Sequence, residues 1–196
     1  KENSYPIVLP SGYKVLVMGV GSKLTFNNRK VIITARRIVS VARAEKLKNL
    51  AINFGDFIVR DNKEDQKFLA EVLAMQMEMA NYEFVKYKTP KSDGWFFIQE
   101  INIFSDDGKT LGDSLIRGKI VGEEINNTRT LSNTPGSDMT PQVLADEAIQ
   151  VAERYGFKVE ILEEKEMALL KMGGVLGVAK GSVEKPKFIV MSYLKG

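Results

Sequence analysis

The most regular hydrophobic pattern in this 196-residue chain lies in Asp65-Gln-Lys-Phe68-Leu-Ala-Glu-Val72-Leu-Ala-Met75-Gln-Met-Glu-Met79-Ala-Asn-Tyr82. Its large apolar residues recur at spacings of 4, 3, 4 and 3, and they are Phe68, Val72, Met75, Met79 and Tyr82. Because an α-helix has about 3.6 residues per turn, this spacing predicts a helix over about residues 65–82 with one buried face. Leu69, Leu73 and Ala80 widen that face. Polar residues expected away from its centre are Glu71, Gln76 and Glu78.

On the C-terminal side of this helix, the sequence predicts a strand and a second helix. The strand covers Trp95–Phe104 and ends at the turn Asp106-Asp107-Gly108. The helix covers about residues 113–130. Gly118 and Gly122 lie one turn apart on it, and they would let a neighbouring element approach closely at some cost in helix propensity.

On the N-terminal side, apolar and β-branched runs predict strands. These runs are Tyr13–Val20, Val31–Thr34, Ile38–Val41 and Leu50–Val59, the last broken at Gly55-Asp56. Because strands and helices alternate along the chain, we predict an α/β domain with a mixed sheet and flanking helices.

A polar turn at Leu131-Ser-Asn-Thr-Pro-Gly-Ser-Asp138 is the expected boundary of this domain. Beyond it, Thr140 and Pro141 predict the start of a helix that ends at Gly156. The predicted buried face of this helix carries Leu144, Ala148, Ala152 and Tyr155. A half-exposed strand, a short helix and a buried last strand are predicted at Phe157–Leu162, Lys165–Met172 and Lys187–Tyr193. This second α/β unit begins and then stops, so we expect a truncated domain.

Composition excludes several classes of function. With no cysteine and no histidine, the chain has no disulfides, no thiolate nucleophile, no Ser-His-Asp triad and no Cys- or His-ligated metal site. The formal net charge of +3 is too small to indicate nucleic-acid binding by itself. No apolar run approaches about 18 residues, so no membrane partner is expected. The absence of cysteine is compatible with a cytoplasmic location.

Two glycine clusters resemble nucleotide-binding loops, but each lacks a required residue. Gly19-Val-Gly21-Ser-Lys-Leu24 has Leu24 where a dinucleotide fingerprint needs its third glycine. Gly174-Val-Leu-Gly177-Val-Ala-Lys180-Gly-Ser182 lacks the Gly-Lys-Ser/Thr succession of a P-loop. Turns are the simpler interpretation of both.

Two charged stretches also have alternative interpretations. The first is basic, and it contains Arg29, Lys30, Arg36, Arg37, Arg43, Lys46 and Lys48. It could attract phosphates, although a solvated face is the simpler interpretation. The second is acidic, with Glu160, Glu163, Glu164 and Glu166 interrupted by Lys165. We interpret it as a solvated face rather than a metal site.

Three stretches together resemble the leucine aminopeptidase, or cytosol aminopeptidase, family of metallopeptidases. The first is Ala80-Asn-Tyr-Glu-Phe-Val-Lys-Tyr-Lys-Thr89, and the second is Thr128-Arg-Thr-Leu-Ser-Asn-Thr-Pro-Gly-Ser-Asp-Met-Thr-Pro-Gln-Val-Leu-Ala145. Met172–Ser182 followed by Pro186–Tyr193 continues in register. The resemblance covers roughly residues 66–196, and the first 65 residues match in pattern only.

This resemblance implies a macro-domain-like N-terminal α/β domain joined by a helix to a catalytic α/β domain. Members of the family are hexameric enzymes that remove N-terminal residues, often Leu, from peptides with two divalent metal ions, Zn or Mn. Their ligands are Asp, Glu and Lys side chains, and a Lys and an Arg act at the transition state. In the family all of these residues follow the strand that here ends at Tyr193. None can be placed on this chain, so we expect no catalytic or metal-binding residue in it and leave substrate-binding residues unknown. Arg129, Asn133 and Pro135 match the family pattern, and we expect them to shape the interdomain turn.

We therefore expect residues 1–130 to form the N-terminal domain, and residues 131–196 to form a linker and the incomplete beginning of the catalytic domain. The chain itself is expected to be inactive and to act in assembly, as a homo-oligomer, and in access to the active site. Two alternatives stay open. One is a binding module for an ADP-ribose-like ligand or nucleic acid, supported by the basic stretch at 29–48 and the Gly19/Gly21 turn. The other is a regulatory remnant that docks on a full-length enzyme.

Overall fold

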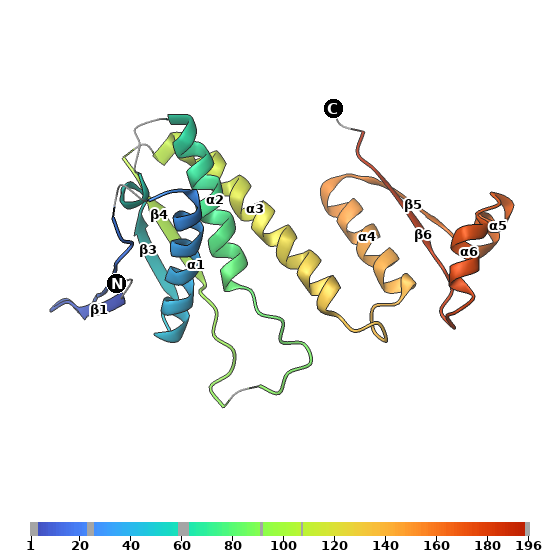
Figure 1. The fold of residues 1–196 in the computed structure, drawn as a ribbon, viewed down its shortest axis with the longest axis horizontal. Helices are drawn as coiled ribbons and strands as arrows, with labels where there is room; N and C mark the ends of the chain where they lie inside the picture. Colours follow the sequence, from blue (N-terminus) through green and yellow to red (C-terminus); the bar gives the residue numbers. More distant parts are fainter. Residues whose placement is uncertain (1–3, 23–25, 59–62, 91, 107, 195–196) are drawn as a thin grey trace. The chain divides into compact units, whose positions relative to one another are not determined.

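The computed structural model describes residues 4–22, 26–58, 63–90, 92–106 and 108–194, and the chain divides into two compact units, Lys1–Thr128 and Arg129–Gly196 (Figure 1). The elements of the first unit are β1 (Ser4–Val8), β2 (Lys14–Met18), α1 (Asn28–Ala44), β3 (Asn49–Asn53), the 3-10 helix η2 (Phe54–Phe57), α2 (Lys63–Asn81), β4 (Glu100–Phe104) and most of α3 (Gly108–Asn133). Those of the second are α4 (Pro141–Tyr155), β5 (Lys158–Leu162), α5 (Glu164–Leu169), α6 (Gly173–Ala179) and β6 (Phe188–Ser192). The predicted α/β class is confirmed.

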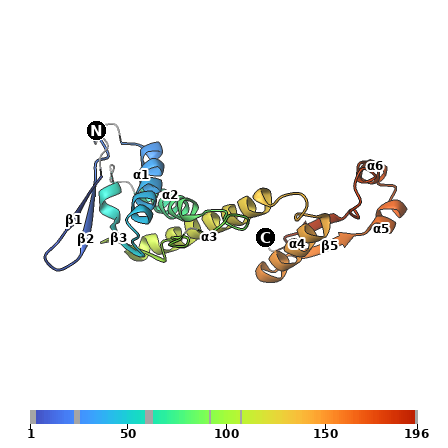
Figure 2. The ribbon, with the colours of Figure 1, turned by 90° about the horizontal axis from the view of Figure 1, so that it is seen from below.

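The strands of the described residues pair into three two-stranded sheets. β1 and β2 are antiparallel and form a hairpin that extends away from the helices of its unit (Figure 2). β3 and β4 are parallel, from Asn49 opposite Glu100 to Asn53 opposite Phe104. β5 and β6 are antiparallel. Parallel and antiparallel pairing therefore both occur, but in separate sheets.

The prediction of strands at 31–34 and 38–41 was wrong, because both runs lie inside α1. The Asn27 side chain caps this helix by accepting the backbone N–H of Lys30 at 3.1 Å. Along α1, buried residues recur at spacings of 4, 4 and 3, and they are Val31, Ala35, Val39 and Ala42. The packing of this face overrides the preference of β-branched residues for strands.

The core of the first unit lies between α1, α2 and the β3–β4 pair (Figure 1). Leu50, Ile52, Ile101 and Ile103 point into it from the strands. The predicted strand at 50–59 is shorter than expected, since η2 follows β3 and buries Phe54 and Phe57. The predicted strand at 95–104 is likewise limited to β4.

The helix predicted at 65–82 is confirmed as α2, but its buried face is rotated from the predicted one. Leu73 is fully buried, whereas Phe68, which begins the predicted stripe, is 55% exposed. Gln76 was expected away from the core, but it is 5% exposed and accepts a hydrogen bond from Arg36 Nε at 2.7 Å. The rotation follows from the position of α1, which packs against the Ala70, Leu73 and Met77 side of α2.

The predicted close approach at Gly118 and Gly122 is present, and the neighbour is α2. A Cβ added at Gly118 would lie 2.1 Å from the backbone oxygen of Glu71. A Cβ added at Gly122 would lie 2.7 Å from Glu78 Cβ. The helix predicted at 113–130 is therefore confirmed as α3, and its two glycines let α2 and α3 contact each other through backbone.

In the second unit, the predicted caps of α4 are confirmed. Thr140 Oγ1 accepts the backbone N–H of Val143 at 3.3 Å, and Gly156 has a left-handed φ of 72°. The predicted buried face is confirmed at Ala152, which is 3% exposed, but it is wrong at Leu144 and Tyr155, which are 44% and 41% exposed. Ala145, next to Leu144, is buried instead. The predicted turn at 131–138 is also shorter, since α3 continues through Asn133.

The remaining elements of the second unit follow the predicted order with two differences. β5 is half-exposed as predicted, and α5 begins one residue before the predicted helix and ends three residues before its predicted end. However, α6 was not predicted, and β6 is not fully buried, because Val190 and Met191 are 37% and 43% exposed. Lys187, just before β6, donates a hydrogen bond to Glu163 Oε1, just before α5. Within the described residues, no helix is both long and apolar enough to cross a bilayer.

Candidate functional site

A cavity of about 250 Å³ lies where the loop after β2 meets the first turns of α1. Its lining residues come from these two segments, and they are Gly19, Val20, Asn27, Arg29, Lys30, Ile33, Thr34 and Arg37. The cavity therefore brings together two features predicted from sequence, the Gly19/Gly21 turn and the start of the basic stretch. We call it the basic pocket.

Local backbone geometry explains how the basic pocket forms. Gly21 adopts a φ of 82°, which favours glycine, and a Cβ added there would lie 3.3 Å from Lys30 Nζ. The loop can therefore pass close to α1. On the helix, Lys30 and Arg37 are seven residues apart and share one face.

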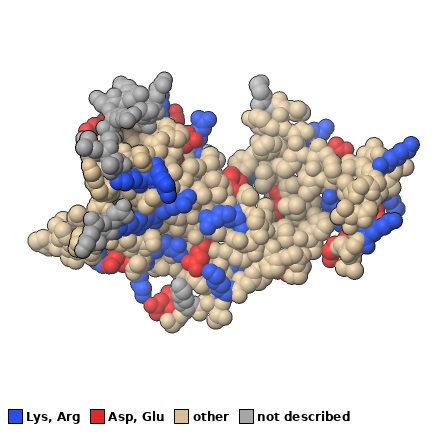
Figure 3. Space-filling view, viewed as in Figure 1, with Lys and Arg blue, Asp and Glu red and all other residues tan. Residues whose placement is uncertain are grey.

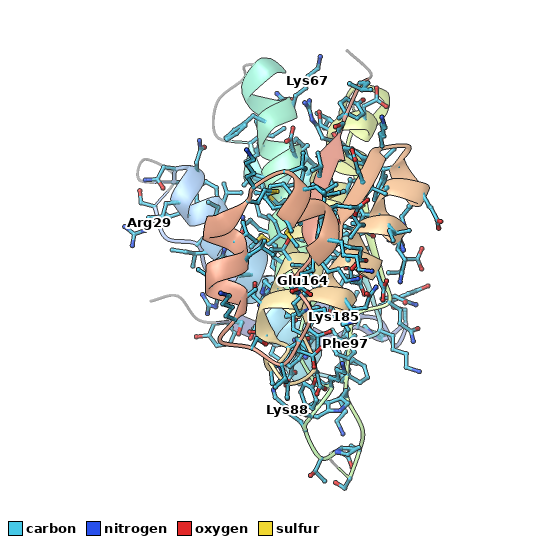
Figure 4. The ribbon with its side chains drawn as sticks, turned by 90° about the vertical axis from the view of Figure 1, so that its right-hand side faces the viewer. Arg29, Lys67, Lys88, Phe97, Glu164 and Lys185 are labelled. Carbon is cyan, nitrogen blue, oxygen red and sulfur yellow. The ribbon has the colours of Figure 1, made fainter. Side chains whose placement is uncertain are left out.

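The electrostatics of the basic pocket favour anions. Arg29, Lys30 and Arg37 line it, and none of the described lining residues is acidic. The N-terminus of α1 adds a partial positive charge from its unsatisfied N–H groups. Figure 3 shows Lys and Arg side chains gathered on this part of the first unit, and Figure 4 shows Arg29 projecting outward from α1. The arrangement is suited to holding a phosphate or a carboxylate.

The other four residues of the basic stretch do not line this pocket. Arg36 hydrogen-bonds to Gln76 of α2. Arg43 Nη2 lies 2.8 Å from Glu83 Oε2, and Lys46 Nζ lies 2.7 Å from Asp93 Oδ2. The backbone oxygen of Lys48 accepts the N–H of Gln99 at 2.7 Å. Some residues of the basic stretch therefore line the basic pocket, and the others connect α1 and the residues after it to neighbouring segments.

A second cavity, of about 520 Å³, lies at the C-terminal end of α1, beside the segment between α2 and β4. Arg43 holds one wall of this cavity in place through two contacts with the segment between α2 and β4. The Nε of Arg43 donates a hydrogen bond to the backbone oxygen of Phe96 at 2.9 Å, and the guanidinium lies 5.0 Å from the centre of the Phe97 ring. Figure 4 labels Phe97 and Lys88 on this segment. Lys88 Nζ lies 5.6 Å from the centre of the Trp95 ring and also pairs with Glu83.

Ion pairing at this second cavity stabilises the charged forms of its carboxyl groups. Hydrogen bonds from Lys88 and Arg43 lower the pKa of Glu83. A hydrogen bond from Lys46 likewise lowers the pKa of Asp93. Both carboxylates therefore form ion pairs with Lys or Arg side chains of this chain. The positive and negative charges of this cavity largely neutralise each other, so it favours neither anions nor cations.

Sequence reasoning missed this second cavity for a physical reason. Arg43 and Glu83 are 40 residues apart, and Lys46 and Asp93 are 47 apart, so no local pattern connects them. The available signal was compositional. Aromatic residues and lysines are both frequent in residues 84–97, and this composition favours cation–π contacts.

The other motifs considered from sequence do not form sites. Residues 174–182 lie largely in α6 rather than in a phosphate-binding loop. In the acidic run, Glu166 accepts the backbone N–H of Glu163 at 2.7 Å and so helps begin α5. Lys23 and Leu24 of the first glycine cluster lie outside the described residues.

The described residues do not fit the two-metal centre that the family resemblance implies. Across these residues, no group of three or more His, Cys, Asp or Glu side chains is placed to hold a metal ion. Neighbouring carboxylates instead pair with Lys and Arg, as at Glu83 and Asp93. No catalytic step can be derived from this set of donors.

Comparison with known proteins matches both units to one family. Residues 6–91 match the family model described as the cytosol aminopeptidase family, N-terminal domain, and residues 126–196 match the one described as the catalytic domain of that family. A protein of Rickettsia canadensis named "Probable cytosol aminopeptidase" is 30% identical over 97% of this chain. One of Alkaliphilus oremlandii with the same name is 29% identical over 92% of it. The chain spans 38% and 36% of the lengths of these relatives.

Solved structures share the fold. A mutant of tomato leucine aminopeptidase aligns with the whole chain at a TM-score of 0.81 and 20% identity, and 39% of that protein is covered. A bottromycin maturation enzyme in complex with Mn aligns with 97% of the chain at a TM-score of 0.77 and 19% identity, again with 39% covered. With both domain models of one family matched in order along the sequence, the chain belongs to the cytosol aminopeptidase family.

Proposed function

We propose that this chain is the N-terminal portion of a leucyl aminopeptidase-like metallopeptidase. In this proposal residues 1–130 form the N-terminal, macro-domain-like domain, and residues 131–196 form the linker and the beginning of the catalytic domain. The observation that carries it is the succession of the two domain matches, at 6–91 and 126–196. The parent enzyme would remove N-terminal amino acids from peptides.

The chemistry of this parent belongs, in our proposal, to residues outside these 196. Two divalent ions, Zn or Mn, would activate water and polarise the scissile carbonyl there. The residues described above would support assembly of a hexamer in the cytoplasm and shape access to the active site. The names of the relatives and the solved complex with Mn support this proposal.

The purified chain is expected to release no leucine from a leucyl anilide above the buffer background, with Mn or Zn added. The physical reason is that a metal-activated water needs several ligands held together, and among the described residues no group of three or more Asp or Glu side chains is placed to hold a metal ion. The reaction is followed by the steady-state absorbance of the aromatic amine that leaves the anilide together with each leucine. Metal-dependent turnover would contradict the proposal.

A second candidate function is anion binding at the basic pocket, in the form of an ADP-ribose-like ligand or nucleic acid. The observation that favours it is the convergence of Arg29, Lys30 and Arg37 on one cavity without an acidic lining residue. Such a set of cations contributes binding that weakens as salt screens it.

Exchange of Arg29 and Lys30 for alanine together is expected to weaken binding of ADP-ribose or a short DNA duplex about tenfold, because two charge-assisted contacts are lost. Thermal shift and a DNA mobility assay at two salt concentrations measure it. The matched control is Lys67→Ala, an exposed lysine on α2 that does not line the pocket (Figure 4). Equal loss in both variants, or no binding by the unaltered chain, would contradict this candidate.

A further inference from the structure

A third cavity, of about 360 Å³, is open to solvent on one side and is lined by residues of α2, α3 and the segment that includes β4. Its wall is mainly apolar, and the side chains that matter here are Met77, Ile101, Ile103, Leu115 and Ile116. A water molecule takes up about 30 Å³ in the liquid, so the cavity has room for a ligand of several non-hydrogen atoms. An apolar wall of this kind stabilises an alkyl group by removing it from water.

One carboxylate at this apolar wall has no ion-pair partner among the described residues. Glu78 of α2 lines the cavity, and among the described residues its carboxylate has no hydrogen bond or ion pair. Lys119 of α3 attracts the Glu78 carboxylate electrostatically, but its Nζ forms an ion pair with Glu123 Oε1 at 3.5 Å. Burial raises the pKa of Glu78, the charge of Glu123 raises it further, and Lys119 lowers it.

The charges around the cavity select the sign of the ligand. Glu78 and Lys119 line it together with Glu100 of β4, and Glu123 lies beside them. Three carboxylates against one ammonium repel an anion and favour a cation. A neutral ligand would leave the half-buried Glu78 carboxylate without a partner, which is unfavourable away from water.

We propose that this cavity binds a primary ammonium carried on a short alkyl chain. The ammonium pairs with the Glu78 carboxylate, and the alkyl chain packs against Ile101, Ile103 and Leu115. The head group then forms the ion pair that Glu78 lacks among the described residues, and the tail packs in the apolar volume. This site is separate from the basic pocket and is independent of the proposed peptidase role.

The test is a calorimetric titration of the full 196-residue chain with isoamylamine. Isoamyl alcohol and isovalerate have nearly the same shape but carry no charge and a negative charge, respectively. The amine is expected to bind at least about tenfold more tightly than the alcohol at pH 7, as a charge-assisted hydrogen bond implies, and isovalerate is not expected to bind. Equal binding of amine and alcohol would overturn the proposal.

Variants and pH locate the binding at Glu78. Glu78→Gln should reduce amine affinity to that of the alcohol, whereas Glu71→Gln on the same helix, which does not line the cavity, should leave it unchanged. An alkylammonium stays protonated to about pH 10, so binding to the unaltered protein should strengthen as rising pH ionises Glu78 and weaken as the carboxyl is protonated. An affinity that is unchanged in Glu78→Gln, or that does not change between pH 4 and pH 7 in the unaltered protein, would also overturn the proposal.

Discussion

Replacing Gly118 with alanine is expected to destabilise the protein by about 2 kcal/mol or more. The added Cβ would lie 2.1 Å from the backbone oxygen of Glu71, and a backbone atom in the middle of α2 cannot move aside without separating the two helices. Overpacking of this kind costs about 1–3 kcal/mol and sometimes more, which outweighs the gain of about 1 kcal/mol in helix propensity. Urea unfolding followed by circular dichroism measures the change.

Gly112 on the same helix provides the matched control. A Cβ added there meets nothing within 4 Å, so Gly112→Ala should leave the free energy of unfolding unchanged or raise it by up to about 1 kcal/mol. The two substitutions are chemically identical and differ only in whether α2 is in contact. If both variants are equally stable, α2 and α3 do not approach each other at Gly118.

Replacing Leu73 with alanine is expected to lower the free energy of unfolding by about 2–5 kcal/mol. Leu73 is fully buried in the cluster that joins α1, α2 and the β3–β4 pair, so its removal leaves a cavity that neighbouring side chains fill only in part. The same urea unfolding experiment measures the loss, and an unchanged slope with denaturant shows that the variant still unfolds in the same way.

The control for Leu73 is Phe68 on the same helix, which is 55% exposed. Although Phe68 is the larger side chain, Phe68→Ala is expected to cost less than about 1 kcal/mol, because most of its surface already contacts water. The hydrophobic pattern alone places both residues on the buried face, with Phe68 in its central stripe and Leu73 beside that stripe. A larger loss from Phe68→Ala than from Leu73→Ala would contradict the observed orientation of α2.

Sequence reasoning succeeded where the signal is local. The Thr140 and Gly156 caps depend on a hydroxyl and a left-handed residue at the helix ends, and both are visible as residue types. Gly118 and Gly122 similarly indicate a close helix contact through the absence of side chains. The family resemblance combined several such local motifs in order, and the matches at 6–91 and 126–196 confirm it.

It failed where distant parts of the chain decide the structure. The β-branched runs around Arg36 favour strands locally, but α1 forms because Val31 and Val39 pack against α2 and the β3–β4 pair. The orientation of α2 also depends on which neighbour covers it. Because α1 packs on one side and α3 on another, apolar spacing alone does not identify the more deeply buried side.

In the candidate sites, too, local sequence signals were recognised, whereas contacts between distant residues were not. The Gly19/Gly21 turn and the basic stretch were both recognised, but the sequence does not say which members of that stretch line one pocket, and in the described residues these are Arg29, Lys30 and Arg37. The unpaired Glu78 carries no sequence signal at all. Its environment is created by residues of α3 and β4, and on an exposed helix the same side chain would be an ordinary solvated carboxylate.

We propose that this chain carries the framework of a metallo-aminopeptidase and that the chemistry of the enzyme lies in other residues. The most direct test measures leucine release by the purified 196-residue chain across a titration of Mn and of Zn, beside a full-length cytosol aminopeptidase as the positive control. We predict turnover by the control and a rate at the buffer background for the chain at every metal concentration. Metal-dependent turnover that rises in proportion to the concentration of the chain would contradict the account.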